Sequence, residues 1–266
     1  MKGRVLIVAG SDSGGGAGIQ ADIKACQVLG AYATTAITAL TAQDTLGVHG
    51  VFAVPPEFVA RQMKVVLDDI GADAIKTGML ATGAVIAAVC DVLATVANTK
   101  LVVDPVMVAK GGAVLLADDA VALLRSRLLP RATLLTPNIP EAEALVGFSI
   151  AGVADMTRAA TVLQAAGANA VLVKGGHLNG PVVTDVLADA GGVRMFEGAR
   201  IDTQNTHGTG CTLASAIAAG LAQGMALDTA IVRARKYLRA AILAAPGFGH
   251  GHGPLGHDAG QPAYPG

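Results

Sequence analysis

Aromatic residues are scarce in this 266-residue chain and make up 3% of it, although hydrophobic residues make up 52%. A core of this composition is built mostly from Ala, Val, Leu and Ile, as in parallel strands that helices cover. The length suits one large α/β domain or two small ones. Because no internal repeat or long linker marks a boundary, we expect a single domain over residues 1–266. A Gly/Pro/His-rich tail starts at about residue 247.

The chain also lacks an excess of charge of either sign. Lys and Arg number 19, Asp and Glu number 20, and the net charge is -1. No basic run and no interleaving of basic and aromatic residues occurs, so we expect no nucleic-acid partner. The tail histidines suggest either a metal site or a flexible polar terminus, and we favour the flexible terminus. They are His250, His252 and His257.

No apolar run is long enough to cross a bilayer. The longest uncharged stretch, 203–227, contains Gln204, Asn205 and His207, and the stretch 80–99 is interrupted by Asp91. The first residues lead directly into a strand-like run and carry no signal-peptide cleavage region. We therefore expect a cytoplasmic protein with no membrane partner.

Cysteines are few. Three of them, odd in number and far apart, argue against a disulfide framework. Cys26 and Cys90 fall within apolar helical patterns and are expected in the core. Cys211 has a different setting, described below.

Short apolar runs alternate with helical patterns along the chain. This alternation predicts an α/β fold with a largely parallel central sheet and helices on both faces. Strands are expected at 5–9, 34–40, 74–77, 101–103, 133–136 and 170–174, and an edge hairpin at 182–188 and 193–197. Helices are expected at 17–29, 56–69, 83–97, 118–128, 140–146, 156–166, 211–223 and 227–244.

Two glycines and a thiol stand at the expected start of helix 211–223, in Gly208-Thr209-Gly210-Cys211. A helix N-terminus favours anions, and glycine lets the backbone approach a ligand closely. The positive potential there also favours the thiolate of Cys211. The segment is therefore either an anion cradle that contains a base or nucleophile, or a glycine-rich loop that only caps a core helix.

Polar residues follow at least five of the expected strands, where ligands bind to such sheets. A glycine-rich loop follows the first strand, with Asp12 and Asp22 nearby. Its glycine spacing fits the dinucleotide fingerprint poorly, and no P-loop is present. The loop either folds over a small ligand or makes a tight turn. Gln43 follows the second strand, where its amide either reads the edge of a nitrogen heterocycle or lies at the surface.

Three further strand ends carry charged or amide side chains. Asp104 is either a cation-linked carboxylate or the cap of a turn. Asn138 and Glu141 have the spacing of an N-terminal cap pair, and their oxygens also suit a magnesium ion held through water. Lys174 either neutralises phosphate oxygens or is a solvated lysine. Because all these residues meet at one rim of one sheet, the pattern favours a functional site.

In this order, and over nearly the whole chain, these segments resemble the hydroxymethylpyrimidine/phosphomethylpyrimidine kinases of thiamine biosynthesis. Those kinases belong to the ribokinase-like superfamily. The motif that spans Asn205 to Thr212 is highly specific, because most of the superfamily has Asp at the position of Cys211. The motifs are Ala9-Gly10-Ser11-Asp12, Gly18-Ile19-Gln20-Ala21-Asp22, Thr38-Ala39-Leu40-Thr41-Ala42-Gln43-Asp44-Thr45, Gly78-Met79-Leu80, Asp104-Pro105-Val106-Met107, Thr136-Pro137-Asn138-x-Pro140-Glu141, Lys174-Gly175-Gly176-His177, Asn205-Thr206-His207-Gly208-Thr209-Gly210-Cys211-Thr212 and Gly251-His252-Gly253-Pro254.

The resemblance implies a homodimer and ATP-dependent phosphorylation of 4-amino-5-hydroxymethyl-2-methylpyrimidine, then of its monophosphate to the diphosphate. It implies that Gln43 binds the pyrimidine ring in a pocket shaped by Gly10, Ala17, Asp22, Met79 and Val106. Asp44 departs from the family, which commonly has Asn there, and this bears on ring preference.

The resemblance further implies the phosphate-handling residues. Gly208, Thr209 and Gly210 would form the anion hole, and Cys211 would deprotonate or position the hydroxymethyl group rather than attack covalently. Lys174 would meet the ATP phosphates. Asn138 and Glu141 would help to hold Mg²⁺ with its waters, and Asp104 is a third candidate metal residue.

Two other functions are compatible with parts of the pattern. Pyridoxal kinase is the first, because its substrate is also a hydroxymethyl-bearing nitrogen heterocycle. A non-catalytic pyrimidine-binding module is the second. Lys174 and Cys211 argue against the binding module, since a pure binder has no need of a phosphate apparatus.

Overall fold

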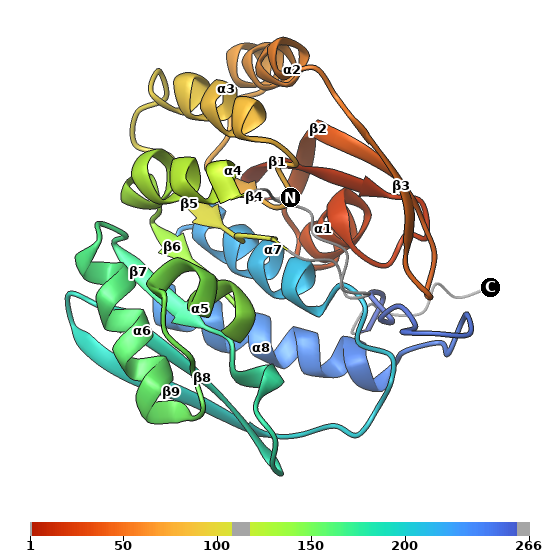
Figure 1. Ribbon diagram of the computed structural model, residues 1–266. Helices are drawn as coiled ribbons and strands as arrows, with labels where there is room; N and C mark the ends of the chain where they lie inside the picture. Colours follow the sequence, from red (N-terminus) through yellow and green to blue (C-terminus); the bar gives the residue numbers. More distant parts are fainter. Residues whose placement is uncertain (1, 108–117, 260–266) are drawn as a thin grey trace.

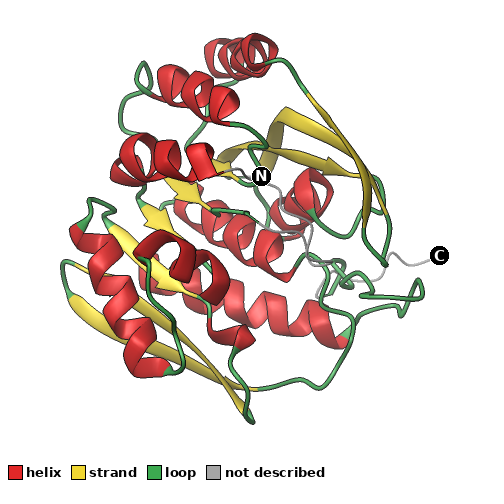
Figure 2. Cartoon of the chain, in the orientation of Figure 1, coloured by secondary structure: helices red, strands yellow, loops and turns green. Residues whose placement is uncertain are grey.

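A computed structural model describes residues 2–107 and 118–259 of the chain, and nine strands of this part form one sheet. The strand order is β3-β2-β1-β4-β5-β6-β7-β8-β9. Neighbouring strands from β2 through β1, β4, β5 and β6 to β7 are parallel, whereas β3, β8 and β9 each pair antiparallel. Figure 2 shows the strands of the sheet in yellow among the helices in red. The strands are β1 (Arg4–Asp12), β2 (Tyr32–Gln43), β3 (Val48–Ala53), β4 (Ala74–Thr77), β5 (Lys100–Val103), β6 (Leu134–Leu135), β7 (Ala170–Val173), β8 (Val182–Asp189) and β9 (Gly192–Ala199).

Helices cover both faces of the sheet (Figure 1). One face packs against α2 (Pro56–Asp69), α3 (Gly83–Leu93), α4 (Asp118–Leu123), α5 (Ile139–Val146) and α6 (Val153–Ala165). The other packs against α1 (Gly18–Val28), α7 (Thr209–Ala222) and α8 (Leu227–Leu243). The predicted fold class is confirmed. Within the described ranges, no helix is long and apolar enough to cross a membrane.

Most expected elements occur, and the differences have physical causes. The segment expected as a loop after 34–40 contains β3, which pairs antiparallel with β2 at the sheet edge. Its residues are mostly exposed, and its apolar side chains do not alternate with polar ones as they do in a strand with one buried face. Helix 83–97 ends earlier, at Leu93, and helix 118–128 changes after α4 into a π-helical turn over Leu124–Leu128. The hairpin of β8 and β9 is confirmed.

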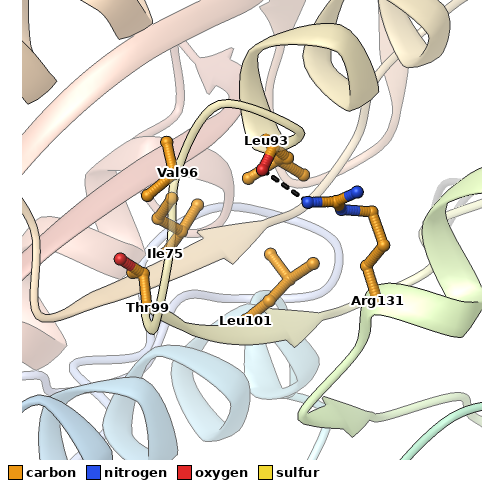
Figure 3. Close-up of a pocket in the computed structure, with 6 residues that line it drawn as sticks. All are labelled: Ile75, Leu93, Val96, Thr99, Leu101 and Arg131. Atoms are coloured by element: carbon orange, nitrogen blue, oxygen red, sulfur yellow. Dashed lines mark hydrogen bonds between the residues drawn. The ribbon is translucent and has the colours of Figure 1, made fainter.

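The sheet has cavities beyond both ends of its strands. A small one, of about 190 Å³, lies near the amino ends of β4 and β5 (Figure 3). Four of its six lining residues are apolar, and the Arg131 guanidinium at its side donates a hydrogen bond to the Leu93 carbonyl. The larger cavity lies at the carboxyl ends, where β2 and β4 flank β1 on opposite sides. Such a switch in strand order is where open α/β sheets bind ligands.

Candidate active site

The larger cavity has a volume of about 550 Å³ and collects nearly all the residues that the sequence predicts for the site. Its lining includes the carboxyl ends of β1 and β2, the segments that follow β1, β4, β5, β6 and β7, and the start of α7. The predicted residues that line it are Gly10, Ala17, Gln43, Met79, Asp104, Val106, Asn138, Glu141, Lys174, Gly208, Thr209, Gly210 and Cys211. Asp22 is the exception.

The start of α7 lies against the glycine-rich loop after β1. Gly208 caps the helix with a left-handed φ of 81°, and a Cβ there would lie 1.8 Å from the Gly16 carbonyl oxygen. A Cβ at Gly210 would lie 3.2 Å from the Lys174 Nζ. The first N–H groups of a helix have no partner inside it and favour an anion. Gly210 therefore keeps a cradle open between these N–H groups and Lys174, and Gly208 lets the loop after β1 pack against the start of the helix.

Lys174 is fixed by carboxylates rather than solvated. Its Nζ donates to Asp104 Oδ1 at 2.7 Å and lies 4.0 Å from Glu141 Oε2, and its side chain is 12% exposed. The Thr136 hydroxyl also donates to Asp104 Oδ1. Burial alone would raise the pKa of Asp104, but Lys174 and Lys76 hold it below its ordinary value. Burial raises the pKa of Glu141 to about 7. The alternative of a solvated lysine is wrong.

Asn138 and Glu141 form the predicted helix cap. Asn138 Oδ1 accepts from the Glu141 N–H at 2.9 Å, and Glu141 Oε2 accepts from the Asn138 N–H at 2.7 Å. The cap occupies the Asn138 oxygen. In the described part of the chain, no group of three or more His, Cys, Asp and Glu side chains is placed to hold a metal. The carboxylates of Asp104 and Glu141 on either side of Lys174 fit a magnesium ion held through its waters.

The surroundings of Cys211 favour the neutral thiol, against the expectation of a thiolate. Burial raises its pKa to about 12, and the nearby carboxylates of Asp22 and Asp104 add to the effect. Lys76 and the Gly18 N–H act in the opposite direction without reversing it. The helix field was the only influence visible in the sequence, whereas loss of water dominates in the fold.

Asp22 lies beneath the cavity rather than in its wall, which corrects its predicted role. Its carboxylate accepts from Lys76 Nζ at 2.9 Å and 2.8 Å and from the Ser215 hydroxyl at 2.6 Å, and all three side chains are buried. Burial would lower the pKa of Lys76, but Asp22 raises it above its ordinary value, so Lys76 stays charged. Lys76 itself lines the cavity.

Gln43 meets a buried histidine. One end of its amide lies 3.2 Å from His207 Nε2, and the other lies 3.2 Å from the Thr41 hydroxyl. The same His207 nitrogen lies 2.9 Å from Asp12 Oδ2. Asp44 does not reach the cavity. Its carboxylate accepts from the N–H groups of the β2–β3 turn and pairs with His49.

The segment 247–259 is docked, so the expected flexible terminus is wrong for these residues; 260–266 lie outside the described part. Pro254 pairs with His207 in a β-bridge, and Thr45 accepts N–H groups from His250 and Gly251. His257 Nε2 lies 2.9 Å from the Thr212 hydroxyl in the first turn of α7. The segment therefore joins the loop after β2 to the start of α7.

Comparison with known proteins identifies the family. A model of the phosphomethylpyrimidine kinase family matches residues 12–256. The chain belongs to the phosphomethylpyrimidine kinase family. A hydroxymethylpyrimidine/phosphomethylpyrimidine kinase of Rhizobium meliloti is 50% identical over 95% of this chain and 96% of its own. A thiamine biosynthesis bifunctional protein of Geobacter sulfurreducens is 53% identical over 96% of this chain, which spans only 52% of that relative.

A solved structure shares the fold. The pyridoxal kinase of Bacillus subtilis in an ADP complex has a TM-score of 0.91 and 38% identity, covering 97% of this chain and 98% of that one. The predicted phosphomethylpyrimidine kinase family and the predicted fold class are both confirmed. A kinase that acts on a small molecule and ATP is therefore the class of protein to which this chain belongs.

Asp12, His207 and Lys76 also line the cavity but were not predicted as site residues. Asp12 and His207 lie in motifs that resemble the family, without a predicted role in binding or catalysis, and Lys76 lies in an expected strand. A charged residue in the middle of an apolar strand was the one available signal for Lys76, since it indicates a buried partner.

Proposed function

We propose that the chain is an ATP-dependent kinase that phosphorylates the hydroxymethyl group of 4-amino-5-hydroxymethyl-2-methylpyrimidine, and then the monophosphate to the diphosphate. The observation that carries this proposal is that one cavity holds both a site suited to phosphate and a side chain suited to a heterocycle. The cradle at the start of α7 opposite Lys174 suits phosphate oxygens, and Gln43 supplies a donor and an acceptor for a heterocycle.

The residues act by positioning and by charge. When bound, ATP supplies the transferred phosphoryl group and Mg²⁺ offsets its charge. The Lys174 ammonium and the N–H groups at the start of α7 stabilise charge that develops on the transferred group. Asp104 and Glu141 hold Lys174 in place and would accept hydrogen bonds from the waters of Mg²⁺.

Cys211 acts as a positioning group in this proposal. A thiol with a pKa of about 12 keeps its proton at neutral pH and is not a resting base. Phosphoryl transfer through a loose transition state requires little removal of the hydroxyl proton before the phosphoryl group moves. A hydrogen bond between the thiol and the hydroxymethyl oxygen would hold that oxygen in line.

Further parts of the proposal rest on the family resemblance. We propose a single cytoplasmic domain that works as a homodimer. Exposed apolar side chains on the edge strand β3 and the turn before it support a subunit contact: Leu46 is 63% exposed and Phe52 67%. Leu40, which pairs with Phe52 across β2 and β3, is also 48% exposed, and contiguous exposed apolar surface marks interaction sites.

The test follows product masses with time. The purified chain is incubated with ATP, Mg²⁺ and the pyrimidine, and mass spectrometry is expected to detect first the monophosphate and then the diphosphate. Omission of ATP is the control. Binding of the pyrimidine without any product would favour the non-catalytic binding module.

Pyridoxal is run in parallel because a specific observation favours pyridoxal kinase as the second candidate. The pyridoxal kinase of Bacillus subtilis superposes with a TM-score of 0.91. Pyridoxal phosphate as the sole product would replace the proposed pyrimidine activity with this one.

A further inference from the structure

The amide of Gln43 lies between two polar groups whose hydrogen positions can be worked out. The structure places Gln43 Nε2 3.2 Å from His207 Nε2 and Gln43 Oε1 3.2 Å from the Thr41 hydroxyl, and the hydrogen positions of these two partners favour the amide turned by 180°. The oxygen and nitrogen of an amide are assigned from such partners. The orientation of the amide determines which position of a bound ring faces the NH₂ donor and which faces the oxygen acceptor.

The first partner is a donor. Asp12 is 3% exposed, and its carboxylate accepts N–H groups from Gly14 at 2.8 Å, Gly16 at 3.0 Å and Ala17 at 2.8 Å. These bonds favour the ionised carboxylate. A histidine nitrogen 2.9 Å from an ionised oxygen must carry a proton, because two lone pairs would otherwise face each other. His207 Nε2 therefore donates to Asp12. A protonated ring nitrogen has no lone pair in the ring plane, so it cannot accept a hydrogen bond from the Gln43 NH₂.

The second partner is an acceptor. A hydroxyl has one proton. Thr41 donates its proton to the Ser11 carbonyl at 2.9 Å, so only lone pairs remain for Gln43. The His207 and Thr41 partners thus favour the same orientation of the amide, with its oxygen toward His207 and its NH₂ toward Thr41.

We infer that Asp12 and His207 lock the Gln43 amide with its oxygen toward His207 and its NH₂ toward Thr41, and that they are positioning residues for the heterocycle. The inference rests on the proposed function for the identity of the ring. With both ends fixed, the amide offers one N–H and one oxygen lone pair in a set order. A ring nitrogen beside an exocyclic amino group, as in a 4-aminopyrimidine, pairs with that edge in one order only.

The order matters because the ring is not symmetric. Turning the amide by 180° would reverse the donor and the acceptor. The ring would then have to turn over to keep its hydrogen bonds, and its hydroxymethyl carbon would lie differently with respect to Cys211. The lock therefore couples recognition of the ring to the position of the reacting oxygen.

The surrounding chain holds the imidazole in place. The backbone N–H of His207 donates to the Gly253 carbonyl at 3.1 Å, and a Cβ at Gly16 would lie 2.5 Å from the ring atom His207 Cδ2. His207 is 8% exposed. The ring is thus packed between the loop after β1 and the docked segment 247–259.

The direct test is the tautomer of His207 in the free protein, measured by two-bond ¹H–¹⁵N correlation spectra with assignment by the variant His207→Gln. We expect a proton on Nε2. A neutral imidazole protonated on Nδ1 alone would overturn the inference. Because this measurement needs no substrate, it stands even where the kinase assay yields no product.

The functional test uses Thr41→Val and Asp12→Asn, with Asp44→Asn as the matched control outside the cavity. Binding of 4-amino-2,5-dimethylpyrimidine, which has the ring edge but no hydroxyl, is measured by calorimetry. We expect affinity to fall about tenfold in both variants, as for loss of one oriented hydrogen bond, and to stay unchanged in Asp44→Asn.

Unchanged affinity in a folded Thr41→Val protein would overturn the inference. Should Asp12→Asn fail to fold, Thr41→Val and the tautomer still decide it. Loss of turnover with intact ring affinity in both variants would also contradict the lock.

Discussion

Cys211 keeps its proton because its surroundings disfavour a second negative charge. Burial is the largest effect, and the Asp22 and Asp104 carboxylates add to it. Lys76 opposes them but is already neutralised by its own ion pair with Asp22. A thiol in this setting donates or accepts a hydrogen bond without becoming a strong nucleophile. Its contribution is therefore to orient the hydroxyl in the transition state.

Substitution separates this role from ring binding. Cys211→Ala is expected to lower kcat at least tenfold and to leave affinity for the pyrimidine nearly unchanged, because orientation matters most during transfer. Gln43→Ala is expected to do the reverse, since its amide meets the ring in ground and transition states alike. Steady-state kinetics and calorimetry measure the two effects.

Cys90→Ala is the control, because this buried cysteine lies on α3 away from the cavity. Equal losses of turnover and ring affinity in a well-folded Cys211→Ala protein would contradict the positioning role.

At the scale of elements, α7 has a left-handed glycine at each end. Gly208 caps its start and Gly224 follows its end, and both have φ of 81°. A Cβ at Gly208 would lie 1.8 Å from a carbonyl oxygen of the loop after β1, whereas nothing lies within 4 Å of a Cβ at Gly224. Substitution of these two glycines therefore distinguishes the cost of a left-handed backbone, present at both, from the cost of a steric clash, present only at Gly208.

Gly224→Ala is expected to lower the free energy of unfolding by about 1–2 kcal/mol through the left-handed backbone alone. Gly208→Ala is expected to lower it by at least about 3 kcal/mol, because it also forces the two loops apart. Urea denaturation measures both. Phosphoryl transfer should fall only in Gly208→Ala. Similar losses of stability in the two proteins would show that the loops are not in tight contact.

Local patterns predicted the elements best where burial is continuous. The buried strand β4 and the helix α2, which begins with Pro56, were predicted to the residue, whereas β1 extends beyond the predicted 5–9 to Asp12. The strand β3 was missed because, with neither face buried, its apolar and polar residues do not alternate. The docking of segment 247–259 was missed for a similar reason. Its backbone contacts Thr45, and its Pro254 pairs with His207. Both contacts depend on the assembled fold rather than on composition.

At the scale of the whole molecule, the rule that ligands bind at the carboxyl ends of parallel strands predicted where the site lies. It brought residues as distant as Gln43, Lys174 and Cys211 into one cavity. That rule does not predict which side chains pair with one another inside the site. Nothing local links Asp12 with His207 or Asp22 with Lys76, because each pair joins segments that only the tertiary fold brings together.

The docked segment makes the stability of the molecule depend on pH. His257 is buried, its Nε2 bonds Thr212 and its carbonyl accepts from the Tyr237 hydroxyl at 2.7 Å. Burial, assisted by Lys24, lowers the pKa of His257 from its ordinary 6.5 to about 4. The folded chain therefore holds this imidazole neutral at pH values where the unfolded chain charges it.

Because the folded pKa is the lower one, the contribution of His257 is complete above about pH 6.5 and is lost as the pH falls toward 4. At pH 5 the loss is ~2 kcal/mol relative to neutral pH. In His257→Gln this part of the pH dependence should disappear, so the drop in unfolding free energy between pH 7 and pH 5, measured in urea, should be smaller by about that amount. His250→Gln, an exposed site in the same segment, should behave like the unsubstituted chain. An equal drop in all three proteins would mean that His257 is solvated, and that the segment does not seal the start of α7.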